Sequence, residues 1–216
     1  FVIKDTPHPL PLFKEYLQKG YYPFAKDTLF SVKMDQIINL TMEVDIPQYA
    51  NMNASTGRKL KKLMSIIAMS VPFKPIMDKI SKMINVSRND LSDYFLYMEN
   101  AGMIAQVRDA TNGIMSLGKV EKVYLDNPNL AYVLGEESSN IGNIRETFFF
   151  NQIRVRNKIT ISKQSDFEIN GITFEIGGKN KGQKQIENLK NAFIVKDDIE
   201  YGSGNIIPIW MFGLNY

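Results

Sequence analysis

The sequence predicts an α+β fold, with helices in its N-terminal half and short strands in its C-terminal third. In the first hundred residues, apolar side chains recur at spacings of three and four, the period of an amphipathic helix. After Lys158, short runs of apolar and β-branched residues are separated by turn residues such as Asn170-Gly171, a pattern typical of strands. We therefore expect helices to come first and a sheet to follow.

The composition limits the kinds of active site that the chain can carry. Of 216 residues, 44% are hydrophobic and 23% are charged, and the net charge of +3 permits contact with nucleic acid without demanding it. There is no cysteine, and the one histidine, His8, lies in a proline-rich leader, which excludes thiolate chemistry and histidine triads. A metal would therefore need oxygen ligands, as Mg²⁺ or Mn²⁺ does. Without an apolar run of bilayer-spanning length, we expect a cytoplasmic protein that makes no membrane contact.

Three helices are predicted in the first 70 residues. The first ends at Gly20, a residue typical of helix C-termini. The second begins at Asp27 or Thr28 and ends before Pro47, because the residue before a proline avoids helical geometry. The third opens near Ser55, and we interpret its basic face as solvated surface, with nucleic-acid contact as the alternative: Arg58, Lys59, Lys61 and Lys62.

A helix-turn-helix followed by a hairpin is predicted next. Helices Pro75–Ile84 and Arg88–Ala101 flank a three-residue turn, and Ser87 is placed to cap the second helix. The hairpin would consist of a strand, a turn and a return strand: Met103–Val107, Thr111-Asn112-Gly113 and Ile114–Leu117. Together with the helix before it, this order predicts a winged helix-turn-helix.

The second helix of the pair is acidic, which bears on whether it reads DNA. It carries Arg88 but also Asp90, Asp93 and Glu99, so its net charge is −2. A helix in the major groove must approach phosphates, which would repel this one. We interpret the wing as a packing or protein-binding surface and leave DNA contact open.

From Lys119 onward the pattern predicts a second region of mixed helices and strands. A buried strand at Lys122–Asp126 and a short helix ending at Leu134 come first, and Ile144–Ile153 follows as a helix rich in phenylalanine. The remaining predicted elements are the strands Lys158–Ser162, Asp166–Ile169, Ile172–Ile176 and Ile206–Phe212, and a helix at Gln183–Leu189.

Two carboxylates lie on neighbouring strands of the predicted hairpin around Asn170-Gly171. Asp166 begins the first strand and Glu175 lies on the second, with Lys179 in the glycine-rich corner that follows. Carboxylates that converge beside a lysine can hold a hard divalent cation and activate a water for phosphodiester hydrolysis. The alternative is an ordinary hairpin with solvated charges.

Several segments resemble, in order, those of one protein family. Phe13 to Gly20 followed by Pro23 fits F-x-x-Y-L-x-x-G-x-x-P, and Asp45-Ile46 follows with Val44 in place of an arginine. The later segments are Asn85–Ile104, the K-x-Y-x-D run Lys122–Asp126, and Gly142–Glu146. This series resembles the C-terminal part of a prokaryotic AAA-type ATPase family, whose tail is a domain of unknown function with a winged helix and a PD-(D/E)XK nuclease-like fold.

The resemblance implies a helical lid-like segment (1–50), a winged helix-turn-helix (51–118) and a PD-(D/E)XK nuclease-like α/β domain (119–216). It also implies an N-terminal ATPase module, with the Walker motifs and the ATP site, that is missing from this sequence. That module, and either DNA or a protein, would be the partners. Asp166 matches the metal-binding aspartate, Glu175 the acid of the E-x-K strand, and Glu146 the helical acid that completes such sites.

The chain departs from the nuclease pattern at Gly177, which stands two residues beyond Glu175 where the pattern places a lysine. Residues i and i+2 of a strand face the same side, so a lysine there would lie beside the metal. Lys179 has the same parity but follows two glycines. We expect a degenerate site, with a loop that returns Lys179 to the carboxylates as the alternative.

The sequence therefore leaves two functions open, one of them enzymatic. The first is a target-binding, regulatory region of an AAA-type ATPase with a degenerate nuclease-like site. The alternative is a Mg²⁺-dependent DNA nuclease in which Asp166 and Glu175 bind the metal, Glu146 assists and Lys179 orients the water. Residues 150–190 hold eight lysines and arginines against four acids, a surplus that favours phosphate.

Overall fold

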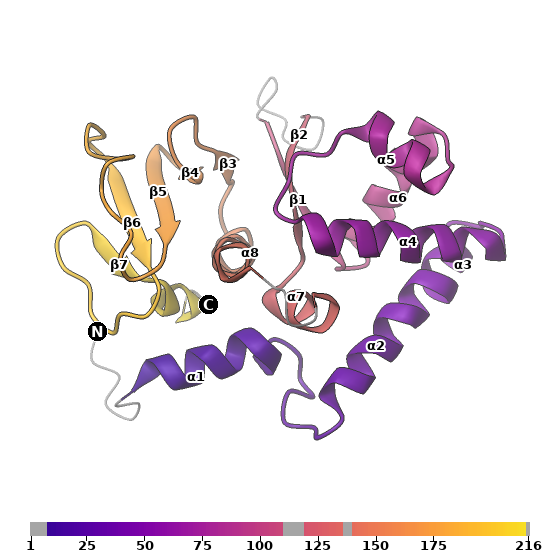
Figure 1. The fold of residues 1–216 in the computed structure, drawn as a ribbon, viewed down its shortest axis with the longest axis horizontal. Coiled ribbons are helices and arrows are strands. Elements are labelled where there is room, and N and C mark those ends of the chain that lie inside the picture. The colour runs from indigo at the N-terminus through magenta and orange to yellow at the C-terminus, as the bar shows by residue number, and fades with distance from the viewer. Residues whose placement is uncertain (1–7, 110–118, 136–139, 215–216) are drawn as a thin grey trace.

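A two-stranded sheet and a helix, α8, lie at the centre of the molecule (Figure 1). The computed structural model describes residues 8–109, 119–135 and 140–214. Most helices gather on one side of this centre, and a five-stranded sheet lies on the other (Figure 1). The predicted α+β class is confirmed.

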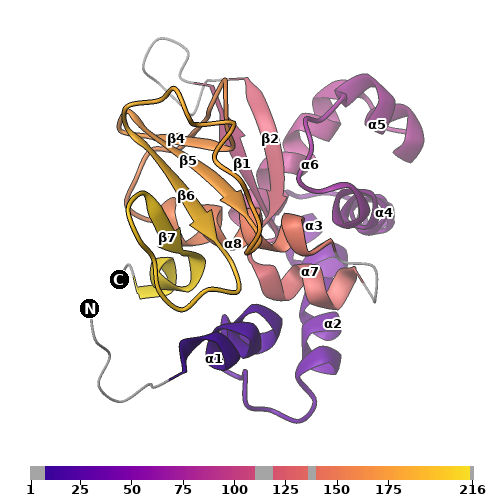
Figure 2. The ribbon, with the colours of Figure 1, turned by 60° about the vertical axis from the view of Figure 1, so that its left-hand side comes forward.

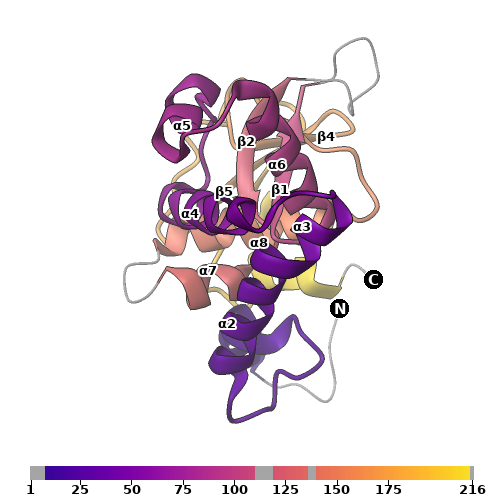
Figure 3. The same cartoon turned by 90° about the vertical axis from the view of Figure 1, so that its right-hand side faces the viewer.

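The first two predicted helices are present, and each contains a π-helical turn. α1 (Pro9–Glu15) continues as η1 (Tyr16–Gly20), so Gly20 does end the first helix. α2 (Phe30–Leu40) passes through η2 (Thr41–Asp45) into α3 (Ile46–Tyr49) (Figure 3), and this helix runs away from α1 (Figure 1). The prediction that the helix ends before Pro47 was therefore wrong. A π turn shifts the hydrogen-bond register, and Pro47 falls in the first turn of α3, where a missing N–H is tolerated.

The segment predicted as a helix-turn-helix forms two helices, α5 (Met77–Ile84) and α6 (Arg88–Asn100), which pack with α4 (Ala54–Ser70). The turn begins at Asn85, whose φ of 54° is the left-handed geometry that asparagine tolerates. The Ser87 hydroxyl accepts a hydrogen bond from the backbone N–H of Asp90 at 3.1 Å, which confirms the predicted cap. No helix of the described residues is long and apolar enough to cross a bilayer.

The two-stranded sheet pairs β1 (Ile104–Arg108) with β2 (Val120–Leu125) in antiparallel fashion. The predicted turn at 111–113 and return strand at 114–117 lie outside the described residues. The described partner of β1 is instead the segment predicted as the first strand of the C-terminal region. The predicted boundary between residues 118 and 119 therefore falls in the connection between two paired strands.

The C-terminal part begins with α7 (Pro128–Leu134) and α8 (Ile141–Ile153). The larger sheet has the order β3-β4-β5-β6-β7, antiparallel from β3 to β5 and parallel from β5 to β7. Asn170 and Gly171 have φ values of 51° and 77°, which fits the two-residue turn predicted between β4 and β5. The strands are β3 (Thr160–Ile161), β4 (Phe167–Ile169), β5 (Ile172–Gly177), β6 (Ala192–Lys196) and β7 (Ile206–Pro208), with a final 3-10 helix, η6 (Ile209–Leu214).

Two C-terminal predictions were wrong and one strand was missed. Residues 183–189 form turns rather than a helix, because a seven-residue segment that buries only Ile186 cannot offset the cost of helix nucleation. The strand expected at Ile206–Phe212 stops at Pro208, which has no N–H to continue the ladder. The missed strand, β6, lies in the sheet between β5 and β7. Its sequence is a short apolar run without alternation, and a pattern of this kind does not distinguish a buried strand from a buried helix segment.

α8 lies between the two sheets (Figures 1 and 2), and all of its residues from Thr147 to Ile153 are buried. Phe149 contacts Phe167 of β4 at a ring-centroid distance of 5.3 Å, and Phe150 contacts Tyr124 of β2 at 4.9 Å. α1 closes the same core from below in Figure 1, with Phe13 edge-on to Phe148 at 4.8 Å. α1 and η1 are thus packed onto the C-terminal part.

Asn129, fully buried at the start of α7, fixes η1 in place. Its Nδ2 donates to the carbonyl oxygens of Tyr16 and Leu17, both at 2.9 Å, and its Oδ1 accepts from the backbone N–H of Tyr21 at 2.9 Å. One side chain therefore satisfies three main-chain groups where the π turn leaves the regular ladder.

We expect Asn129→Ala to lower the free energy of unfolding by roughly 2–4 kcal/mol, because three buried hydrogen bonds are lost and their partners stay desolvated. Urea unfolding at neutral pH measures the change. Asn143→Ala is the matched control, because Asn143 donates a single bond, at 2.7 Å to the Val71 carbonyl. We expect it to cost about 1 kcal/mol. Equal losses for the two variants would contradict the role assigned to Asn129.

Candidate functional site

The three predicted acids come from three different elements. Glu146 lies on α8, Asp166 immediately precedes β4, and Glu175 lies on β5. Glu146 and Glu175 are both close enough to Asp166 to raise the pKa of its carboxyl group. We call these three residues the acidic centre.

Glu175 is the buried member of the acidic centre, with 1% of its surface exposed. Its Oε2 accepts a hydrogen bond from the Ser165 hydroxyl at 2.5 Å. Its Oε1 forms an ion pair with the ammonium group of Lys181, a side chain that is 30% exposed. Both carboxylate oxygens are therefore engaged by groups of the chain itself.

Glu146 is held by the two-stranded sheet. Its Oε2 accepts from Lys122 Nζ at 2.7 Å and from the Tyr124 hydroxyl at 3.2 Å, both on β2. Burial, reinforced by the negative charge of Glu146, raises the pKa of Tyr124. The phenol therefore stays protonated at neutral pH and remains a hydrogen-bond donor.

Asp166 is the member whose charge is least compensated. Its Oδ2 accepts from the backbone N–H of Ile176 at 2.7 Å, which ties the start of β4 to β5. Burial raises the pKa of Asp166 to about 6, and repulsion from Glu146 and Glu175 adds to the shift. The Ile176 amide and Lys122 oppose it. Asp166 therefore binds a proton more tightly in the folded chain than in the unfolded one.

Lys179, the predicted lysine of the site, lies on the exposed surface of the glycine-rich corner. Its carbonyl oxygen accepts a hydrogen bond from Lys196 Nζ at 3.3 Å. The lysine that the structure brings to Glu175 is Lys181, which sequence reasoning missed. The signal was the run Gly178-Lys179-Asn180-Lys181, whose composition is typical of a β-turn that reverses the chain.

As arranged, the acidic centre does not fit a divalent cation. Mg²⁺ and Mn²⁺ need several free oxygen ligands at short distance, whereas both oxygens of Glu175 are engaged. Among the described residues, no group of three or more histidine, aspartate or glutamate side chains could hold a metal ion. The three acids thus share one region without forming a metal cage.

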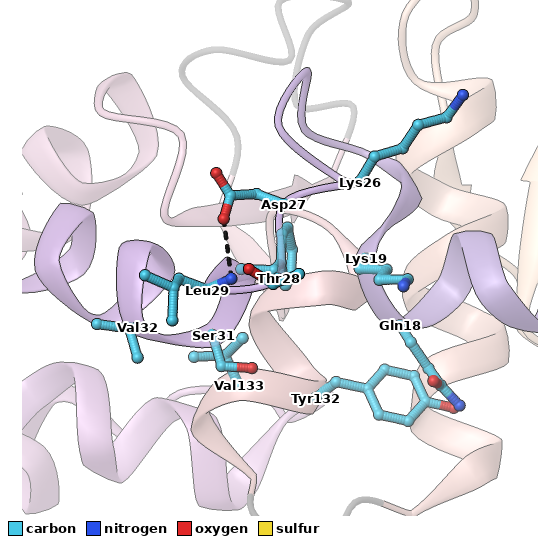
Figure 4. A pocket seen from close by; sticks show the side chains of 11 residues that line it. Gln18, Lys19, Lys26, Asp27, Thr28, Leu29, Ser31, Val32, Tyr132 and Val133 are labelled. Carbon is cyan, nitrogen blue, oxygen red and sulfur yellow. Dashed lines mark hydrogen bonds between the residues drawn. The ribbon is translucent and has the colours of Figure 1, made fainter.

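A separate concavity of about 450 Å³ lies between η1, the start of α2 and α7 (Figure 4). Asp27 lies in the turn before α2, where its Oδ1 accepts a hydrogen bond from the Leu29 N–H at 2.8 Å. Its lining includes two lysines, three hydroxyl groups and four apolar side chains: Gln18, Lys19, Lys26, Asp27, Thr28, Leu29, Phe30, Ser31, Val32, Tyr132 and Val133. Because Asp27 places a negative charge just before the start of α2, the geometry does not favour a bound anion.

The raised pKa of Asp166 predicts a pH dependence of stability. A carboxyl group whose pKa rises from 3.8 to about 6 on folding stabilises the folded state fully below 3.8, and this contribution is lost as pH rises to about 6. Asp166→Asn keeps an acceptor for the Ile176 N–H but cannot titrate. We expect the free energy of unfolding of the wild type, relative to this variant, to fall between pH 3.8 and about 6.

Urea unfolding at a series of pH values checks this expectation. Glu168→Gln, at an exposed acid of β4, is the matched control. A difference between wild type and Asp166→Asn that stays constant or increases over this range would overturn the assignment.

Comparison with known families gives one match, and it lies N-terminal to all three residues of the acidic centre. The Domain of unknown function (DUF8612) matches residues 10–140, which include α1 to α7 and the two-stranded sheet. No curated protein and no solved structure matches the chain significantly. Because the match covers more than half of its residues, the chain belongs to the DUF8612 family of domains of unknown function.

Proposed function

We propose that this chain is the target-binding and regulatory region of an AAA-type ATPase, in which a nuclease-like domain serves as a scaffold. The observation that carries this proposal is the state of Glu175. The carboxylate is buried, and Lys181 and Ser165 engage both of its oxygens. A site that cuts phosphodiesters would need this acid to be available to a metal or to a water.

The order of elements supports a nuclease-like scaffold. α8 precedes three antiparallel strands, and β6 then adds in parallel to β5. An acid lies on the helix, another at the start of the second strand and a third on the third strand, as in the PD-(D/E)XK pattern described above. The segment expected as the second helix, residues 183–189, is the part that differs.

The packing of the lid-like segment supports a regulatory role. η1 is fixed to α7 by Asn129, and α1 packs on α8 through Phe13 and Phe148. α8 also carries Glu146 of the acidic centre. A displacement of the lid-like segment would therefore act directly on the C-terminal part, and an ATPase module attached to that segment, with its own ATP site, would be the first partner.

The helix-turn-helix supports a protein target more than DNA. We assign α4, α5, α6 and the β1–β2 sheet to a winged helix-turn-helix. α6 exposes Asp90 and Asp93, whereas its third acid, Glu99, pairs with Arg108 of β1 at 2.5 Å. Its outer face therefore carries two acids that would oppose phosphate.

A second candidate function, a Mg²⁺-dependent DNA nuclease, is favoured by one observation. Asp166 lies in the field of two further carboxylates, and accumulated negative charge of this kind is common where a cation is bound. The arrangement does not fit a divalent cation, because both oxygens of Glu175 are already engaged, and this makes the nuclease the second candidate.

A cleavage assay decides between these functions. We expect the purified chain, with Mg²⁺ or Mn²⁺, to leave single-stranded, duplex and branched DNA intact, because Glu175 is not available. Cleavage that is lost in Asp166→Asn and kept in Glu168→Gln would favour the nuclease and overturn the scaffold.

Binding of labelled duplex DNA, followed by fluorescence anisotropy, tests the assignment of α6. We expect dissociation constants no tighter than the non-specific range of about 10⁻⁴–10⁻⁶ M at physiological salt. Tighter binding that Arg88→Ala abolishes would contradict the preference for a protein target. Lys26→Ala removes an exposed cation far from α6 in the sequence and serves as the control.

A further inference from the structure

The side chain of Lys181 crosses directly over Gly177. A Cβ atom added to Gly177 would lie 2.5 to 2.8 Å from Cβ, Cγ and Cδ of Lys181, closer than real side chains approach. Glycine is therefore the residue that lets the lysine stem pass. The position where the nuclease pattern places its lysine is filled by the stem of a lysine four residues later.

The path of the chain between these two residues is fixed by backbone contacts. The N–H of Lys181 donates to the Gly178 carbonyl at 2.9 Å, which closes a β-turn. The N–H of Asp197 donates to the Gly177 carbonyl at 2.9 Å, and Arg145, ion-paired with Asp197 at 2.8 Å, lies against Gly178. The turn therefore starts from an anchored point and returns Lys181 to β5.

In the ion pair between Lys181 and Glu175, the lysine side chain can move away, whereas the buried carboxylate cannot. Glu175 is 1% exposed, and a buried carboxylate without a counter-charge is strongly destabilising. Lys181 is 30% exposed, so its ammonium group can reach water by rotation of its own side chain. If the lysine left, Oε1 of Glu175 would lose its counter-charge and become open to another cation.

We infer that Lys181 is the built-in cation of the acidic centre, whose ammonium group takes the place at Glu175 that a divalent cation would occupy. This inference deepens the proposed function and rests on it, because it explains why a nuclease-like scaffold keeps its acids closed. Charge repulsion then makes Lys181 and a divalent cation mutually exclusive at Glu175.

Calorimetric titration of Mn²⁺ into Lys181→Met tests the inference, because methionine keeps an unbranched stem over Gly177 and removes only the charge. We expect Mn²⁺ to bind this variant at least ~10-fold more tightly than the wild type, since one opposing charge has gone. Added Mn²⁺ should also raise its unfolding temperature. Lys179→Met removes the same charge two residues away and should leave the Mn²⁺ affinity at the wild-type value.

A second variant keeps the inference testable if Lys181→Met does not fold, which circular dichroism would show. Gly177→Ala places a Cβ in the path of the stem and should displace the ammonium group, again with tighter Mn²⁺ binding. In either variant, a further Glu175→Gln change should abolish the gain. Equal Mn²⁺ affinity of wild type and variants, or a gain that survives Glu175→Gln, would overturn the role of Lys181.

The wild-type protein separates this inference from the proposed function. DNA cleavage by the wild type that depends on Asp166 would refute the scaffold, whatever Lys181 does. The ratio of Mn²⁺ affinities between Lys181→Met and wild type tests Lys181 alone. If the wild type does not cleave DNA and binds Mn²⁺ as tightly as Lys181→Met does, the scaffold proposal is retained and the role of Lys181 as built-in cation is refuted.

Discussion

The pairing of β1 with β2 is the interaction on which the rest of the structure depends. Because side chains alternate along a strand, Val123 and Leu125 of β2 enter the core of α2 to α6, and Tyr124 enters the core around α8. β1 divides in the same way, with Ile104 on one side and Ala105 on the other. A register slip of one residue would exchange the two faces and place a tyrosine in the wrong core. The two cores are therefore joined by one ladder whose register both of them specify.

The same strand also helps to build the acidic centre. Lys122 and Tyr124 are two residues apart on β2 and hence face the same side, where both donate to Glu146. The centre is therefore assembled from the five-stranded sheet, α8 and the two-stranded sheet together. This assembly also relates the family match to the site. Residues 10–140 include β2, which supplies two of the donors, although the three acids come later in the chain.

Local signals in the sequence were sufficient for much of the fold. Helices with a clear apolar period and a cap, such as the one that begins after Ser87, were predicted correctly, as was the hairpin around Asn170-Gly171. The failures depend on contacts that are distant in sequence. Pro47 is tolerated because a π turn precedes it, and Ala192–Lys196 is a strand because β5 and β7 flank it. The acids of the site were found through the predicted helix and strands that carry them, whereas their cation was not.

Lys181 was missed because the alternation of side chains along β5 was extended beyond Gly177, where the strand ends. After Gly177 the chain turns back, so the distance in space between Glu175 and a later lysine no longer follows the count of residues. What a buried carboxylate requires is a counter-charge within reach, wherever in the sequence it originates. A glycine at the motif position therefore does not mean that the ammonium group has been lost. The glycine allows Lys181, which comes from the turn, to reach Glu175 itself. An ammonium group that neutralises Glu175 then closes a site that a divalent cation would otherwise enter.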